Sequence, residues 1–197
     1  MRNVRSYRYF LGIRPDPRLY PAFQAFAEAA GQPVQLALAQ LTVCVVGECA
    51  ERDRFMLPRI QRALAGQPLY SFPVNFSRIV TGPHGAAAQT FGRQDDIQDF
   101  YRMLVRQLRA CGIEPMYRKS GFHPHATLGY RACEPRVLRI ALEWYPFELL
   151  LIESEIGMTR HNVLSRWPLL PPRQPPLPFD RNAPAACQAG TRSSAAR

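Results

Sequence analysis

The sequence predicts an α+β fold made of two related halves. Two stretches of similar pattern support this prediction: in each, a polar residue, an apolar residue and a threonine lead into an apolar run typical of a strand. The first stretch is 39–47 and the second is 122–129. A chain of 197 residues has room for one domain, or for two small lobes that share a core.

Apolar periodicity and turn residues place further elements along the chain. Asp16 followed by a proline is typical of a helix start, and Gly31 is typical of a helix end. The stretch Asp95–Ala110 has the most regular helical spacing of apolar residues, and an aspartate at one of its first two positions is expected to cap it. Strands are predicted at 7–13, 36–46, 72–80, 86–91, 147–153 and 160–169, and helices at 16–31, 57–66 and 95–110. The stretch 134–144 is expected to form a short helix or a loop.

The second stretch holds a histidine and a threonine in the order His-x-Thr. Alternate side chains of a strand share a face, so His125 and Thr127 are expected to point the same way. An imidazole exchanges protons near neutral pH and a threonine hydroxyl donates a hydrogen bond, so the pair suits binding of one phosphate group. The alternative is a histidine on a half-buried strand whose ring is satisfied by a backbone carbonyl group.

The order and spacing of these motifs resemble the 2H phosphoesterase superfamily, in particular the branch of 2′-5′ RNA ligases and RNA 2′,3′-cyclic phosphodiesterases. That family carries two H-x-T motifs, one in each lobe, that face each other across a cleft. The second motif is intact here as His125-Ala126-Thr127. Gln40 stands at the histidine position of the first motif, and Thr42 fits its threonine.

The resemblance covers about residues 5–170, including the opening strand and the closing run through Trp167. It implies a two-lobed, pseudo-symmetric domain over 1–170, with antiparallel sheets lining a central cleft and helices outside. Residues 171–197 are rich in proline and small polar residues, and we expect them to form a disordered tail.

The resemblance also implies acid–base chemistry that needs no metal and no cofactor. One histidine takes a proton from the attacking oxygen, the opposite one protonates the departing oxygen, and the two threonines hold the phosphate. The basic residue that often follows the second motif is displaced by one position here, at Arg131. The expected site residues are His125, Thr127 and Thr42 for catalysis and Gln40, His123 and Arg131 for substrate binding.

Gln40 breaks the symmetry of this site. A carboxamide donates and accepts hydrogen bonds but exchanges no proton near pH 7. Two outcomes stay open: His123 supplies a substitute proton carrier and a phosphodiesterase or RNA ligase-like enzyme survives, or the cleft binds a nucleotide phosphate without efficient turnover. The first outcome meets a geometric objection, because two residues of one strand approach phosphorus from the same side.

The expected ligand is RNA or a small nucleotide with a cyclic or terminal phosphate. The net charge is +10 and Lys119 is the only lysine, and arginine's planar fork suits phosphate. A bias toward arginine in the genome would give the same composition. A non-catalytic RNA- or nucleotide-phosphate-binding module is the alternative function, and Arg118, Lys119 and Ser120 are further candidates for phosphate contact.

The remaining polar residues give weaker indications. The five cysteines are expected to be reduced thiols, and a zinc site of His123, His125 and Cys44 is a minor alternative. His84, in a turn, and His161, in the last hairpin, are expected at the surface rather than in the site. With neither a signal peptide nor a membrane-spanning run in the sequence, we expect a cytoplasmic monomer that contacts no membrane.

Overall fold

A computed structural model describes residues 6–33, 35, 39–90, 92, 94–116, 121–158 and 160–173. Its elements in chain order are β1 (Tyr7–Ile13), a 3-10 helix (Pro17–Leu19), α1 (Tyr20–Ala29), β2 (Leu41–Cys49), α2 (Met56–Leu64), β3 (Val74–Gly82), β4 (Gly85–Thr90), α3 (Asp95–Ala110), β5 (His125–Gly129), β6 (Val137–Trp144), β7 (Glu148–Glu155) and β8 (Arg160–Pro168).

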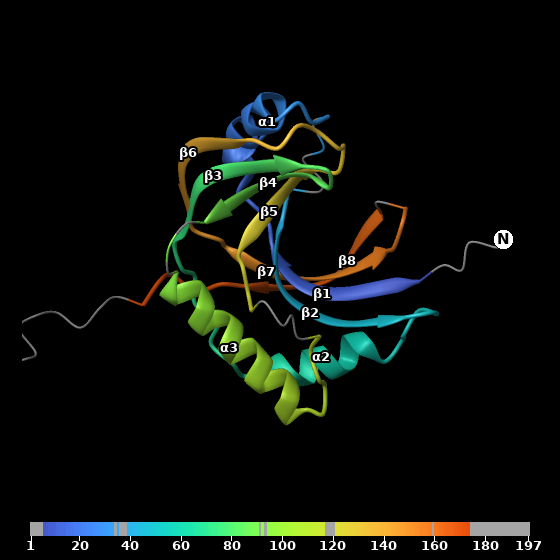
Figure 1. The fold of residues 1–197 in the computed structure, drawn as a ribbon. Helices are drawn as coiled ribbons and strands as arrows, with labels where there is room; N and C mark the ends of the chain where they lie inside the picture. The colour runs from blue at the N-terminus through green and yellow to red at the C-terminus, as the bar shows by residue number, and fades with distance from the viewer. Residues whose placement is uncertain are drawn as a thin grey trace, which may run out of the picture.

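The eight strands form one antiparallel sheet in the order β6-β3-β4-β5-β2-β1-β7-β8. Its middle is narrow, because β2 and β5 share a single pair of partners, Leu41 and Ala126. Every other pair of neighbouring strands has at least four paired positions. The sheet therefore divides into two four-stranded halves, β6-β3-β4-β5 and β2-β1-β7-β8, which diverge from the β2–β5 junction (Figure 1). The predicted two-lobed α+β fold is confirmed, with its two halves continuous as one sheet.

The helices cover the outer faces of the two halves. Figure 1 shows α1 against the half that contains β3 to β6, and α2 with α3 below β1 and β2. The buried residues of α3 are Ile97, Phe100, Leu104 and Leu108, which recur at the spacing of one helix face and join the main core. A second, small cluster of Phe10, Leu150 and Ile152 lies apart from that core. Because Phe10 lies between two core residues of β1, this cluster belongs to the sheet face opposite the helices.

Most predicted elements are present, with two corrections. The stretch expected to be a helix or loop is mostly strand β6, whose residues alternate between exposed and half-buried before the buried Trp144. A period of two is the signature of an edge strand with one solvated face, and it outweighs the turn residues that precede it. The capping prediction for α3 is also wrong, because Asp95 is the first helical residue and the cap position is Gln94. Strand β2 begins at Leu41, and 36–38 of the predicted strand lie outside the described residues.

The last described residues contact the segment between α2 and β3. Leu170 pairs with Tyr70, and the Arg173 guanidinium lies 4.3 Å from the centre of the Tyr70 ring. The rest of the predicted tail, 174–197, lies outside the described residues. Within the described ranges, each helix is too short or too polar to cross a membrane.

Candidate active site

The β2–β5 junction brings the two motif stretches together. Leu41 pairs with Ala126 in antiparallel register, so Thr42 is the cross-strand neighbour of His125, and Gln40 precedes β2 beside Thr127. Leu41 and Ala126 are fully buried in the core, which leaves the four polar residues on the opposite face of the sheet. Residues about 85 positions apart in sequence thus lie next to each other at the β2–β5 junction. We use the word groove for this junction together with the two cavities that adjoin His125.

The ring of His125 is oriented by the backbone. Its Nδ1 lies 2.9 Å from the carbonyl oxygen of His123. A carbonyl oxygen only accepts hydrogen bonds, so Nδ1 carries a proton and Nε2 is the atom that gains or loses one. The bond is the backbone contact expected of an ordinary strand histidine. It also leaves the second ring nitrogen able to act as an acid or a base.

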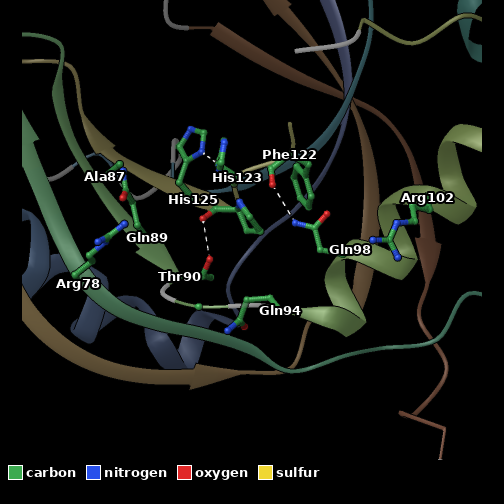
Figure 2. A pocket seen from close by; sticks show the side chains of 12 residues that line it. Arg78, Ala87, Gln89, Thr90, Gln94, Gln98, Arg102, Phe122, His123 and His125 are labelled. Carbon is green, nitrogen blue, oxygen red and sulfur yellow. Dashed lines mark hydrogen bonds between the residues drawn. The ribbon is translucent and has the colours of Figure 1, made fainter. Parts of the chain in front are cut away.

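Two cavities adjoin His125. A small one of about 40 Å³ is lined by Thr42 of β2 together with His123 and His125. A larger one of about 790 Å³ is also lined by His123 and His125, and Figure 2 shows Arg78 and Gln89 along one wall and residues of α3 along the other. Strand pairing explains this wall, since Arg78 pairs with Gln89 and Gln89 pairs with His125. The sheet therefore presents a row of polar side chains that continues from His125 into the larger cavity.

Gln40 is in contact with a histidine from the far edge of the sheet. Its amide nitrogen Nε2 lies 3.0 Å from Nδ1 of His161 on β8. Gln40 is only 6% exposed, and within the described part of the chain its carbonyl oxygen Oε1 has no hydrogen-bond partner. The expectation that His161 lies at the surface away from the site is wrong, because β8 turns up from its half toward the other one and carries the half-buried ring to Gln40 (Figure 1).

Burial and a nearby cation act on His161. Desolvation lowers the pKa of its imidazole, and the positive charge of Arg14 lowers that pKa further. The ring packs edge-on against Phe10, with 5.7 Å between ring centres. Both effects favour the neutral ring near pH 7, which is the form that accepts a proton. Arg14 itself has a buried Nε without a hydrogen-bond partner among the described residues.

The remaining residues singled out in the sequence lie outside the β2–β5 pairing. His123 is exposed and precedes β5, so strand alternation does not govern its side chain, although it lines both cavities beside His125. Arg131 lies beyond β5 with an exposed side chain, and its backbone exchanges two hydrogen bonds with Gln32, at 2.8 and 3.0 Å. His84 is an exposed turn residue, as expected. The candidates at 118–120 lie outside the described residues.

The metal alternative finds little support in the described ranges, where no group of three or more His, Cys, Asp or Glu side chains is arranged to hold a metal ion. Cys44, the thiol considered for such a site, is buried in the core, and burial raises the pKa of that thiol to about 12. Metal ligation requires the thiolate, which this environment disfavours. Cys44, Cys49, Cys111 and Cys133 are free thiols, as expected.

The described fold is that of the 2H phosphoesterases, as the sequence predicts. E. coli LigT in complex with 3′-AMP superposes with a TM-score of 0.67 at 19% identity, over 83% of this chain and 98% of that one. A crystal structure of a phosphoesterase gives 0.65 at 20% identity over 82% and 98%, and TT0787 of Thermus thermophilus gives 0.63 at 20% identity over 82% and 97%. No protein-family model and no curated protein matches the sequence.

Proposed function

We propose that the groove at the β2–β5 junction binds the phosphate of a nucleotide or of an RNA end, and that its reaction is the opening of a 2′,3′-cyclic phosphate. The observation that carries the proposal is the adjacency of Gln40, Thr42, His125 and Thr127, created by the pairing of Leu41 with Ala126. Two hydroxyl groups and an amide donate to phosphate oxygens, and Nε2 of His125 exchanges a proton with a reacting oxygen.

The size and lining of the neighbouring cavity support a nucleotide as the ligand. A volume of about 790 Å³ is in the range that holds small organic ligands. Its wall offers amide side chains and the Arg78 guanidinium, which suit the polar edges of a nucleoside and its phosphate. The LigT structures hold 3′-AMP, phosphate, ATP and NADP+, which are ligands of the same chemical kind.

Catalysis is impaired relative to a site with two motif histidines, because the residue at position 40 transfers no proton. Loss of one acid–base group costs about 10²–10⁴-fold in rate. Binding depends on the hydroxyl and amide donors and is retained. The protein thus keeps the phosphate site of its fold and works below the rate that an imidazole at position 40 would allow.

Gln40→His is the variant that tests this proposal. We expect it to raise kcat for a nucleoside 2′,3′-cyclic phosphate by about tenfold or more, because it adds an imidazole beside Thr127. Affinity for a nucleoside monophosphate should change little, as position 40 still carries a hydrogen-bond donor. Steady-state kinetics and calorimetric titration give the two quantities.

Gln61→His is the matched control, because Gln61 is exposed on α2. It should leave both quantities unchanged. Equal turnover by the wild type and Gln40→His would contradict the impairment. Nucleotide binding without turnover in either form would instead identify a non-catalytic phosphate-binding module.

A further inference from the structure

A row of polar side chains crosses the half β6-β3-β4-β5 and ends at His125. Arg139 of the edge strand β6 pairs with Arg78 of β3. Arg78 pairs in turn with Gln89 of β4, and Gln89 pairs with His125 of β5. Residues directly opposite each other in antiparallel strands have their side chains on the same face. The row therefore extends the site by three strands, with two arginines at its far end.

Burial shows which face of the sheet carries this row. The next residues along the four strands belong to the main core or pack against it: Leu138, Ile79, Ala88 and Ala126. Because successive side chains of a strand alternate between faces, the row lies on the face opposite that core. Arg139 is exposed there, and Arg78, Gln89 and His125 line the same cavity of about 790 Å³ (Figure 2).

The far end of the row concentrates positive charge. Like charges directly opposite each other on neighbouring strands destabilise a sheet, and Arg78 and Arg139 form such a pair. A phosphate group held between two guanidinium groups would replace this repulsion by charge-assisted hydrogen bonds. The neighbouring cavity adds Arg102 from α3, and none of the described residues that line it is acidic. This end of the row therefore favours an anionic ligand.

A second row, mostly apolar, runs beside the first on the same face. It is formed by Val137, Val80 and Ala87, which pair across β6, β3 and β4, and it ends at Thr127 of the second motif. Val137 is 63% exposed, so the strip is open to a ligand at its outer end. A nucleic-acid strand presents charged phosphates on one side and sugars and bases on the other, which matches a cationic row beside an apolar one.

The length of the row indicates how much of such a strand it holds. Neighbouring strands lie about 4.8 Å apart, so the backbone of Arg78 is about 10 Å and that of Arg139 about 14 Å from His125. A stacked nucleic-acid strand carries one phosphate per about 3.4 Å of its axis, and an extended strand carries fewer. The row thus spans the phosphates of a few nucleotides, which is more than a mononucleotide provides.

Resting on the function proposed above, we infer that Arg78 and Arg139 bind the phosphates that precede the terminal one, and that the substrate is the end of an RNA strand. The terminal phosphate lies at His125, the next one is held by Arg78, and the strand continues over β6 past Arg139. The strand is RNA because a 2′,3′-cyclic phosphate requires a ribose 2′-hydroxyl group. Arg78 and Arg139 determine specificity in this arrangement, and neither takes part in proton transfer.

Binding of ligands of increasing length tests the inference without requiring turnover. Calorimetric titration would compare 3′-AMP, adenosine 3′,5′-bisphosphate and the 3′-phosphorylated adenosine trinucleotide. We expect Kd to fall about five- to tenfold from the first ligand to the second and again from the second to the third, because each step adds a phosphate within reach of a further arginine. The bisphosphate shows whether a second phosphate alone is recognised, and the trinucleotide shows whether a strand is.

Two arginine variants and one control locate the effect. Arg78→Ala should remove most of the gain of the bisphosphate over 3′-AMP, and Arg139→Ala should remove most of the gain of the trinucleotide over the bisphosphate. Arg62→Ala is the matched control, because Arg62 is exposed on α2, and it should keep both gains. Melting temperatures establish that the variants are folded, and the exposed position of Arg139 makes its variant independent of any packing defect at Arg78.

The salt dependence of binding gives a second measurement. The slope of log K against log salt concentration is about −0.7 per phosphate contact for a single strand. Each arginine variant should therefore reduce the slope for the trinucleotide by about 0.7, and Arg62→Ala should leave it unchanged.

The outcomes separate the inference from the proposed function. Equal affinity for 3′-AMP and the trinucleotide, or a gain with length that survives in both arginine variants, would overturn the inference and leave the function standing. Equal binding of trinucleotides with a 3′-phosphate and with a 3′-hydroxyl group would overturn the proposed phosphate site at His125, and the inference with it. Absence of binding by all of these ligands would also overturn both.

Discussion

His125→Ala is expected to lower turnover of a nucleoside 2′,3′-cyclic phosphate by about 10²–10⁴-fold, the largest loss that a single substitution in the groove should produce. The reason is that His125 is the one histidine of the two motifs, and its Nδ1 bond to the His123 carbonyl holds Nε2 ready for proton transfer. Because the hydroxyl groups of Thr42 and Thr127 remain, the loss should appear in kcat, with a smaller change in affinity for a nucleoside monophosphate.

Steady-state kinetics of His125→Ala and His84→Ala, measured side by side, check this expectation. His84 is exposed in the β3–β4 turn, so its loss should not alter kcat. His125→Asn keeps a polar group at the position without a titrating nitrogen, and it should be as impaired as the alanine variant. Turnover within a fewfold of wild type in both His125 variants would remove His125 from the mechanism.

Gly85→Ala is expected to destabilise the fold by about 3 kcal/mol. Gly85 has a φ of +111°, where a side chain is strained, and a Cβ there would lie 2.7 Å from the Cα of Tyr130 and overlap the carbonyl oxygen of Gly129. Both obstacles are backbone atoms at the end of β5, so they move only if the strand that carries His125 moves. The effect should therefore reach the active site as well as stability.

Urea unfolding monitored by circular dichroism measures the free-energy change. Gly82→Ala is the matched control, because Gly82 ends the partner strand of the same hairpin and a Cβ there meets nothing within 4 Å. We expect the control to stay within about 0.5 kcal/mol of wild type. Equal stability of the two variants would show that the Gly85–Gly129 contact does not constrain the end of β5.

The parts of the site that the sequence predicts are those set by local spacing. His125 and Thr127 share a face because strands alternate, and the repeat of this pattern around Gln40 indicates a second, matching strand. The buried face of α3 can also be predicted from local spacing, because its apolar residues recur at the helical period. The prediction for 134–144 failed because turn residues at its start obscured the alternation of an edge strand, which is weak when one face is solvated.

Local sequence pattern does not predict the contact between His161 and Gln40. Nothing in the 160–168 stretch indicates that its histidine meets Gln40, which is 121 residues away. That contact depends on the curvature of the whole sheet, which brings the last strand of one half over the groove. The row from Arg78 through Gln89 to His125 depends in the same way on the register of three strands, which spacing within one strand does not specify.

The central claim is that the two motif stretches form one phosphate site, and titration with inorganic phosphate tests it most directly. The ring signals of His125 in NMR spectra should shift along one saturable curve, and those of His84 should stay in place. Thr42→Val and Thr127→Val should each weaken binding by about five- to tenfold, because each removes one hydroxyl donor and keeps the side-chain shape. If Thr42→Val binds phosphate as tightly as the wild type, or if His125 does not respond at saturation, the two stretches do not share a phosphate.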